Sequence, residues 1–208
     1  MAYNRFVSAL LPLFPLDVVM LPGAPLPLHV FEPRYKEMIG EALAASKPFG
    51  LVRAKENTIA ELGCSAEIIE VTKKYDDGRM DIVAEGRQRF EIVQVNEERT
   101  FLQAEVRYFD DDPGSTPPSD VEKLLKLHQE LLGLAGAESA ETPEADDPQI
   151  SFHIAGVLPL DLDFKQTLLG MRSEPQRVTA LIEYYTALVP QVRRTLKVRE
   201  KARGNGHV

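Results

Sequence analysis

The stretch from residue 11 to residue 35, LPLFPLDVVMLPGAPLPLHVFEPRY, contains six prolines, and most of the residues between them are apolar. Prolines inside a helix remove backbone donors and clash with the preceding turn, so the stretch is predicted to be extended. Proline is also restricted to the edges and ends of strands, so we expect three short strands, at 11–14, 18–21 and 26–31. The rest of the chain must cover their apolar side chains, since each stabilises the fold by about 1.5–3 kcal/mol when fully buried.

A helix is predicted to begin at Pro33, because proline suits the first helical position, where its missing donor is not needed. An apolar stripe at helical spacing supports this prediction and consists of Tyr35, Met38, Ile39 and Ala42. The next proline, Pro48, is expected to end the helix.

Alternating apolar and polar residues predict strands between residues 49 and 108. The alternation is clearest at 102–108, where one face is apolar and the other is polar. Asp77-Gly78 separates two such runs, which is typical of a tight hairpin. Gly86 is predicted to mark a bulge or bend that lets a small sheet curl into a barrel.

The second half of the chain is predicted to be helical. Residues 110–119, DDDPGSTPPS, have the composition of a linker, and Ser119 and Glu122 have capping-box spacing at the start of a leucine-rich helix. Further helical stripes start near Asp147 and Leu162 and after Ser173. We therefore expect an α+β fold with a β-rich lobe at 1–112 and an all-helical lobe at 113–208.

Composition narrows the class of protein. A chain of 208 residues can bury a sizeable core, and its single cysteine, Cys64, excludes an internal disulfide. No apolar run approaches the roughly 20 residues that span a bilayer, so we expect a cytoplasmic protein with no leader and no membrane partner. The net charge of −8 disfavours nucleic acid as a partner, because such binding depends on clustered Lys and Arg.

The proline-rich stretch also resembles a known family. PLFPLDVVMLPGAPLPLHVFEPRY is similar to the opening signature of the LON domain, the amino-terminal substrate-binding region of the ATP-dependent Lon protease. Similar segments follow in order, namely GCSAEIIEV, DGRMDIVAEGRQRFEIV, FLQAEVRYF and HIAGVLPLDLDFKQTLLG. The resemblance implies a single LON domain over about 9–203, with a PUA-like β pseudobarrel followed by a helical bundle.

Catalytic motifs are missing from the sequence. There is no G-x-x-x-x-G-K-[ST] phosphate loop, so ATP hydrolysis has no visible site. The Lon protease cuts with a serine and lysine pair in a separate carboxy-terminal domain, and the resemblance covers only the substrate-binding part. We expect a non-proteolytic chain that is not an enzyme and needs no cofactor.

Single reactive residues have ordinary explanations. Cys64 lies in an alternating strand and is expected to be a small buried hydrophobe. Ser151 and His153 are two residues apart on a helix and do not face each other, so they form no catalytic pair. The remaining histidines are His29, His128 and His207. None has ligand-like spacing to other histidines, cysteines or carboxylates, so no metal site is expected.

The candidate peptide-binding residues are Phe31, Glu32, Arg34, Tyr35, Arg87, Arg89 and Phe90. Two interpretations of the EPRY segment stay open. In the structural one, Glu32 is an acid at a helix start, favoured by about 0.3–1 kcal/mol, and Arg34 pairs with it or with Glu37. In the functional one, these residues lie at the rim of a groove between the lobes, where arginine and tyrosine serve recognition.

The leading hypothesis is therefore a recognition module, a monomer or weak homodimer, that binds unfolded or apolar peptide segments, with a protease or chaperone as a further partner. One alternative is a docking surface for a single folded partner. A second is a small hydrolase whose site assembles from His29, His153 or Cys64. A third is RNA binding through the PUA-like barrel, against which the acidic balance counts.

Overall fold

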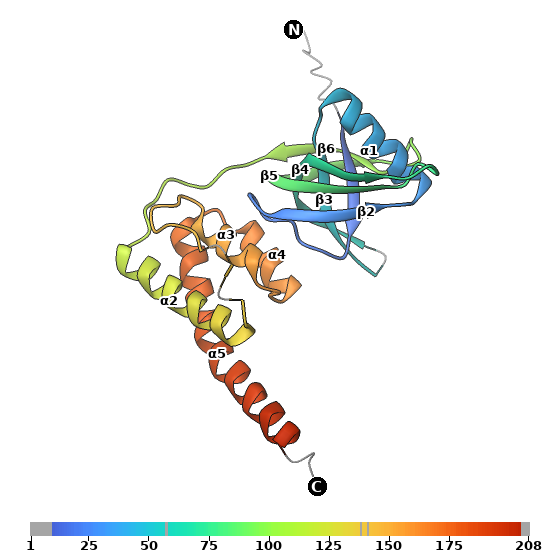
Figure 1. Cartoon of the computed structure of the whole chain (residues 1–208). Coiled ribbons are helices and arrows are strands. Elements are labelled where there is room, and N and C mark those ends of the chain that lie inside the picture. Colours follow the sequence, from blue (N-terminus) through green and yellow to red (C-terminus); the bar gives the residue numbers. More distant parts are fainter. Residues whose placement is uncertain (1–9, 57, 138, 141, 205–208) are drawn as a thin grey trace. The chain divides into compact units, whose positions relative to one another are not determined.

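The computed structural model describes residues 10–56, 58–137, 139–140 and 142–204 (Figure 1). The described chain contains six strands and five helices and has an α+β fold. It divides into two compact units, which we name the β unit (Met1–Asp110 with Asp161–Gly170) and the helical unit (Asp111–Leu160 with Met171–Val208).

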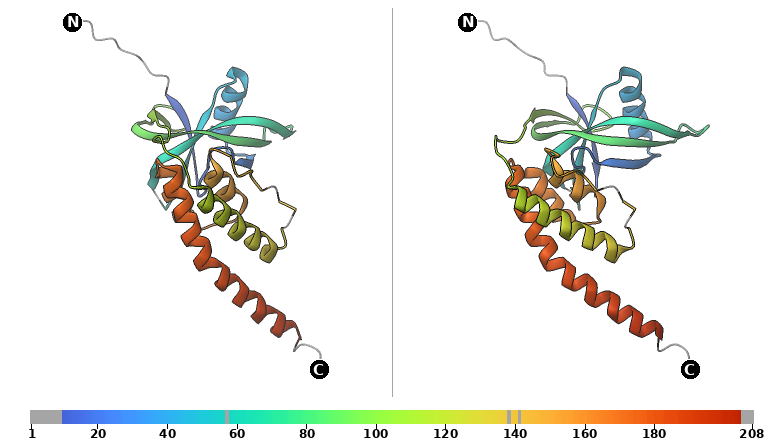
Figure 2. Two further views of the ribbon diagram at one scale, coloured as in Figure 1. Left: turned by 90° about the vertical axis from the view of Figure 1, so that its left-hand side faces the viewer. Right: turned by 60° about the vertical axis from the view of Figure 1, so that its left-hand side comes forward.

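The β unit is built on one mixed six-stranded sheet. Its strands are β1 Leu11–Leu16, β2 Pro25–Val30, β3 Phe49–Lys55, β4 Thr58–Lys74, β5 Met80–Asn96 and β6 Gln103–Tyr108. The order is β2-β5-β4-β3-β1-β6, and β6 also pairs with β5. This extra pairing, with residues 90–96 of β5, closes five strands into a ring, while β2 pairs with residues 80–85 of β5. Figure 2 gives two further views of the chain.

The proline-rich stretch forms β1 and β2, whereas the strand predicted at 18–21 is absent. Met20 and Leu21 are nevertheless buried, because this segment packs against the backbone of β5. Gly23 donates to the carbonyl of Gly86 at 2.9 Å, and Gly86 donates to Ala24 at 3.1 Å. A Cβ at Gly86 would collide with the carbonyl oxygen of Leu21, so glycine is required at this close approach. The β4–β5 register shifts beside Gly86, as predicted for a bulge.

Helix α1 spans Pro33–Ala45, with proline in the first turn. Its buried residues are those of the predicted stripe, Tyr35, Met38, Ile39 and Ala42. The helix ends at Ser46, which adopts a left-handed conformation with φ of 49°. The backbone N–H groups of Ser46 and Lys47 then donate to Leu43 and Ala42 and satisfy carbonyls of the last turn.

Helix α4, Leu162–Gly170, belongs to the β unit, although the sequence placed this segment in the helical lobe. Arg53 in β3 donates to the carboxylate of Asp163 at 2.5 Å. Gln166 donates to the carbonyl of Leu62 in β4 at 3.1 Å. These contacts are made to strands more than 100 residues away, so local periodicity carries no sign of them.

The helical unit contains α2 Pro118–Ala135, α3 Ile150–Val157 and α5 Glu174–Gly204. Helix α2 starts one residue before the predicted cap, and Pro117 at its N-cap makes no side-chain bond. Pro190 lies inside α5, which continues to Gly204. Within the described ranges, no helix is long and apolar enough to cross a membrane.

Arg177 in α5 is fully buried and organises this unit. Its guanidinium donates to the Oγ of Ser151 at 2.8 Å and to the carbonyl of Met171 at 2.8 Å. It also pairs with the carboxylates of Asp111 and Glu174 and lies 4.0 Å from the centre of the Phe152 ring. The second residue of the predicted linker, Asp111, is therefore fixed by an ion pair.

Candidate functional site

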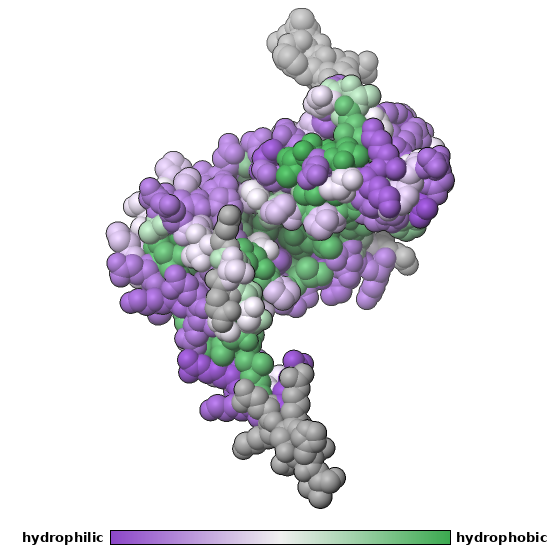
Figure 3. Space-filling view, in the orientation of Figure 1, coloured by the Kyte–Doolittle hydropathy of each residue, from purple (hydrophilic) through white to green (hydrophobic). Residues whose placement is uncertain are grey.

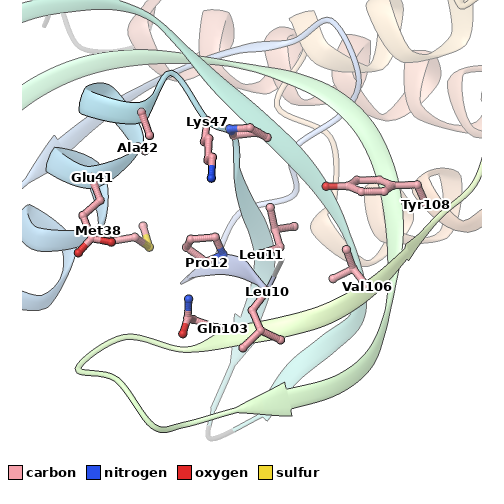
Figure 4. A pocket seen from close by; sticks show the side chains of 12 residues that line it. Leu10, Leu11, Pro12, Met38, Glu41, Ala42, Lys47, Gln103, Val106 and Tyr108 are labelled. Carbon is pink, nitrogen blue, oxygen red and sulfur yellow. The ribbon is translucent and has the colours of Figure 1, made fainter. Parts of the chain in front are cut away.

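The β unit has an open hollow of about 540 Å³, which we name the α1 groove (Figure 4). Residues at the start of β1 form its floor, namely Leu10, Leu11 and Pro12. The α1 side contributes Met38, Glu41, Ala42, Ala45, Lys47 and Pro48. Strand β6 contributes Gln103, Val106 and Tyr108. Most of these side chains are apolar, and Figure 3 shows apolar surface on the β unit with hydrophilic residues around it.

The groove exists because β6 extends beyond its pairing with β1. Leu11 pairs with Ala104 and Pro12 with Gln103, and these are the two β1–β6 pairs within the described residues. Farther along β6, Val106 and Tyr108 pair with β5 on the other side. Within the described residues, the hollow lies between this part of β6, the start of β1 and the α1 side.

The acidic group in the groove wall is already bound. Both carboxylate oxygens of Glu41 accept hydrogen bonds from Arg99, at 2.7 and 2.5 Å. Arg99 also donates to Glu37 at 2.8 Å. These hydrogen bonds hold the pKa of Glu41 below its ordinary value, so the carboxylate stays ionised and occupied.

Lys47 is the cation in the groove wall, and unlike Glu41 it forms no ion pair with a described residue. Its side chain is exposed, and within the described residues no carboxylate lies in ion-pair distance of its ammonium group. Its position at the C-terminal end of α1 also favours a positive charge, through the helix dipole. Among the residues that the structure describes, the groove therefore combines apolar walls with one cation that has no ion-pair partner.

The EPRY segment makes the contacts expected from the structural interpretation. Arg34 pairs with Glu32 at 2.8 Å, and its guanidinium lies 4.6 Å from the centre of the Tyr35 ring. Tyr35 is buried and stacks on Phe14 with ring centres 4.2 Å apart, and burial raises the pKa of its hydroxyl. Phe31, the residue before this segment, is 59% exposed.

The three predicted residues of β5 do not form one surface. Arg87 lies on the outside of the sheet and pairs with Glu67 and Glu85. Arg89 is buried, with its guanidinium 4.6 Å from the centre of the Phe109 ring. Phe90 is fully buried in a core cluster with Leu11, Leu13, Val52 and Ala104. Arg89 and Phe90 therefore support the sheet from inside, because neither offers a peptide an accessible side chain.

The residues considered for hydrolysis lie in separate surroundings. Cys64 is fully buried, and burial raises the pKa of its thiol to about 12, so it is no ready nucleophile. His29 binds Asp81 at 2.5 Å in the β unit, whereas His153 pairs with Asp147 in the helical unit. His207 lies outside the described residues, within which no group of three or more metal-ligating side chains occurs.

Comparison with known proteins gives the family. The family model of the ATP-dependent protease La (LON) substrate-binding domain matches residues 10–186. The chain belongs to this LON domain family. Lon protease 1 of Hydrogenovibrio crunogenus is 26% identical over 197 residues, which cover 86% of this chain and 23% of that protein. The Lon protease of Flavobacterium johnsoniae is 23% identical over 219 residues, which cover 96% and 27%. This LON chain thus spans about a quarter of the length of these relatives.

Solved structures show the same fold. The Lon N-terminal domain protein from Xanthomonas campestris matches this LON chain with a TM-score of 0.69 and 24% identity, covering 84% of this chain and 98% of that one. The N-terminal domain of the Mycobacterium avium complex Lon protease also matches with a TM-score of 0.69, at 19% identity, covering 85% and 98%.

Sequence reasoning missed the α1 groove of this LON domain. The signals were present in part, since the β6 alternation put Val106 and Tyr108 on one apolar face and the α1 stripe included Met38. Lys47 gave no signal, because a lysine after a helix is ordinary. What was missing was the length over which β1 and β6 pair, which only the folded sheet shows.

Proposed function

We propose that this LON domain is a cytoplasmic, non-enzymatic recognition module that reversibly binds apolar segments of unfolded polypeptides, with a protease or chaperone as a further partner. We also propose that its closed sheet is a PUA-like pseudobarrel followed by a helical lobe, and that it acts as a monomer or weak homodimer. The observation that carries the proposal is the α1 groove, an open apolar hollow on a chain of the substrate-binding family.

The size and lining of the groove suit a few apolar side chains. Its volume of about 540 Å³ falls in the range of roughly 300–1,000 Å³ that is usual for small-ligand sites. Leu10, Pro12 and Ala45 offer apolar contact area without a catalytic group beside them. Such a lining supports binding by shape and hydrophobic contact, which tolerates many sequences.

Strand addition at the exposed sheet edge is a poorer route for peptide binding. Strand β2 pairs only with β5 among the described strands, so its other edge is free. Pro25 and Pro27 alternate along this strand, and neither has an N–H to donate. Prolines on an edge strand block pairing with a further strand. We therefore place the peptide in the α1 groove, held by its side chains.

A second contact surface in our proposal is the predicted site around Phe31, Glu32 and Arg34, with Arg87 as a further polar contact. Its support is the exposed ring of Phe31 beside the Glu32–Arg34 pair. Tyr35, Arg89 and Phe90 belong to this surface only as interior supports. Its position in a groove between the lobes stays a prediction.

The test is a titration of labelled apolar peptides and of a reduced, unfolded protein, followed by fluorescence anisotropy. We expect saturable binding with a Kd from micromolar to millimolar, about −8 to −4 kcal/mol, without turnover and without a need for ATP. Ala45→Trp should fill the groove and weaken binding at least about tenfold, because it competes with the apolar side chains. Ala44→Trp is the matched control, since Ala44 is an exposed α1 residue outside the groove lining.

If Ala45→Trp and Ala44→Trp bind the peptides with equal affinity, the α1 groove is not the peptide-binding site. If no peptide binds at all, a docking surface for one folded partner is the better explanation. Peptide or ester hydrolysis abolished by Cys64→Ala or His153→Ala would instead favour a hydrolase. Binding of mixed RNA at low salt would favour the RNA alternative.

A further inference from the structure

Three polar side chains that line the α1 groove can donate hydrogen bonds. Lys47 presents an ammonium group, Gln103 an amide and Tyr108 a hydroxyl, which Figure 4 shows pointing into the groove. Burial raises the pKa of Tyr108, so its hydroxyl keeps its proton and remains a donor near neutral pH. Three donors beside apolar walls complement an acceptor that carries negative charge.

Glu41 does not compensate for Lys47. Both oxygens of its carboxylate are taken by the guanidinium of Arg99, which also binds Glu37. In Figure 4 the ammonium group of Lys47 points toward Pro12 on the groove floor. A ligand carboxylate that enters above Pro12 therefore meets a cation whose charge no described side chain has neutralised.

We propose that the α1 groove selects apolar polypeptide segments that carry one aspartate or glutamate, whose side-chain carboxylate binds the ammonium group of Lys47. This inference rests on the proposed function and gives it a substrate class. The apolar neighbours of the acid lie on Leu10, Pro12 and Ala45, and Gln103 and Tyr108 are further polar groups of the same lining. Unfolded polypeptides supply such segments along their length, so an internal acidic side chain is the source to which the groove is matched.

The experiment uses the full chain and acetylated, amidated octapeptides of leucine, valine, phenylalanine and glycine around one central residue. That residue is glutamate, glutamine or lysine, and the blocked ends remove other charges. Wild-type protein should bind the glutamate peptide about threefold to tenfold more tightly than the glutamine peptide, and the lysine peptide most weakly. At 1 M salt the preference should shrink, because screening then acts within about 3 Å.

Lys47→Met keeps most of the side-chain volume and removes the charge, so it should bind the glutamate and glutamine peptides equally. The matched control is Lys123→Met, which makes the same charge change at an exposed position of α2. The control should keep the full preference for glutamate.

Other outcomes overturn the inference in distinguishable ways. If Lys47→Met weakens all three peptides by the same factor, Lys47 supports the groove without selecting acids, and the proposed function stands. A lysine peptide that binds best would also overturn the inference. If an apolar peptide without an acidic side chain but with a free C-terminal carboxylate binds more tightly than the glutamate peptide, Lys47 recognises the ends of chains instead of internal acids. If no peptide binds, the proposed function and this inference both fail.

Discussion

Arg89 in β5 donates a hydrogen bond from Nη1 to the backbone carbonyl of Leu169 in α4, at 3.1 Å, across 80 residues of sequence. The guanidinium is buried, so this contact fixes the last turn of α4 to the sheet. Leu168 and Leu169 are buried beside it. A residue that the sequence suggested for peptide recognition thus holds a helix on the β unit.

Replacing Arg89 should loosen α4. Arg89→Met leaves the Leu169 carbonyl without its charged donor, and we expect a loss of about 1.5–3 kcal/mol in the free energy of unfolding. Urea denaturation measures the loss, and hydrogen exchange should show faster amide exchange in α4. Arg107→Met is the control, because the Arg107 side chain is 73% exposed and pairs with Glu91 on the surface. A control loss as large as that of Arg89→Met would contradict the role given to Arg89.

Truncation should destabilise the fold strongly at one phenylalanine of the proline-rich stretch and hardly at all at another. Phe14 is buried against Tyr35, so Phe14→Ala should lower the free energy of unfolding by about 3–5 kcal/mol. Phe31→Ala should change it by less than about 0.5 kcal/mol, because that ring is exposed. Thermal and urea unfolding compare the two. A loss below about 1 kcal/mol for Phe14→Ala would mean that its ring is not in a packed core.

The buried ion cluster of the helical unit should be sensitive to the loss of its cation. Arg177→Met removes the buried cation that pairs with the carboxylates of Asp111 and Glu174, and we expect a destabilisation of about 3–5 kcal/mol. Hydrogen exchange in α2, α3 and α5 reports it. Arg193→Met, which removes an exposed arginine of α5 that pairs with Glu130, should have a small effect. Equal effects would show that the buried cluster contributes no more than a surface pair.

His128 should make the stability of the helical unit depend on pH. It is fully buried, its ring nitrogens have no partner among the described residues, and burial lowers its pKa. As pH falls through about 6.5, the unfolded chain takes up a proton that the folded chain refuses, so folding weakens. The loss stops growing once the pH is below the folded pKa.

The measurement is the urea midpoint between pH 7.5 and 5. His128→Phe should reduce the slope in this range and keep the ring stacked near Tyr185, whose centre lies 6.2 Å from that of the His128 ring. Tyr185 adds no slope of its own, because burial raises the pKa of its hydroxyl farther above this range. An unchanged slope in the variant would assign the pH dependence to other groups.

The sequence by itself determined the elements whose signal is local. The stripe of α1 gave its buried face, and the alternation at 102–108 gave the strand β6. Proline chemistry predicted the extended form of the first stretch, and a long motif predicted the LON family that the comparison shows. Each of these follows from residues a few positions apart, because helix and strand periods are set by the backbone.

The tertiary structure decided what lies against each of these faces. The segment at 18–21 is buried without forming a strand, because its partner is the backbone around Gly86. Helix α4 is bound to the β unit by hydrogen bonds of Arg53, Arg89 and Gln166. In the helical unit, Arg177 pairs with Asp111, which lies 66 residues away in the sequence. Within the described part of the chain, β1 and β6 pair over two residues, and the α1 groove lies beside the rest of β6. Periodicity shows which face of an element is apolar, but the packing of distant segments decides whether that face is covered or left as a site.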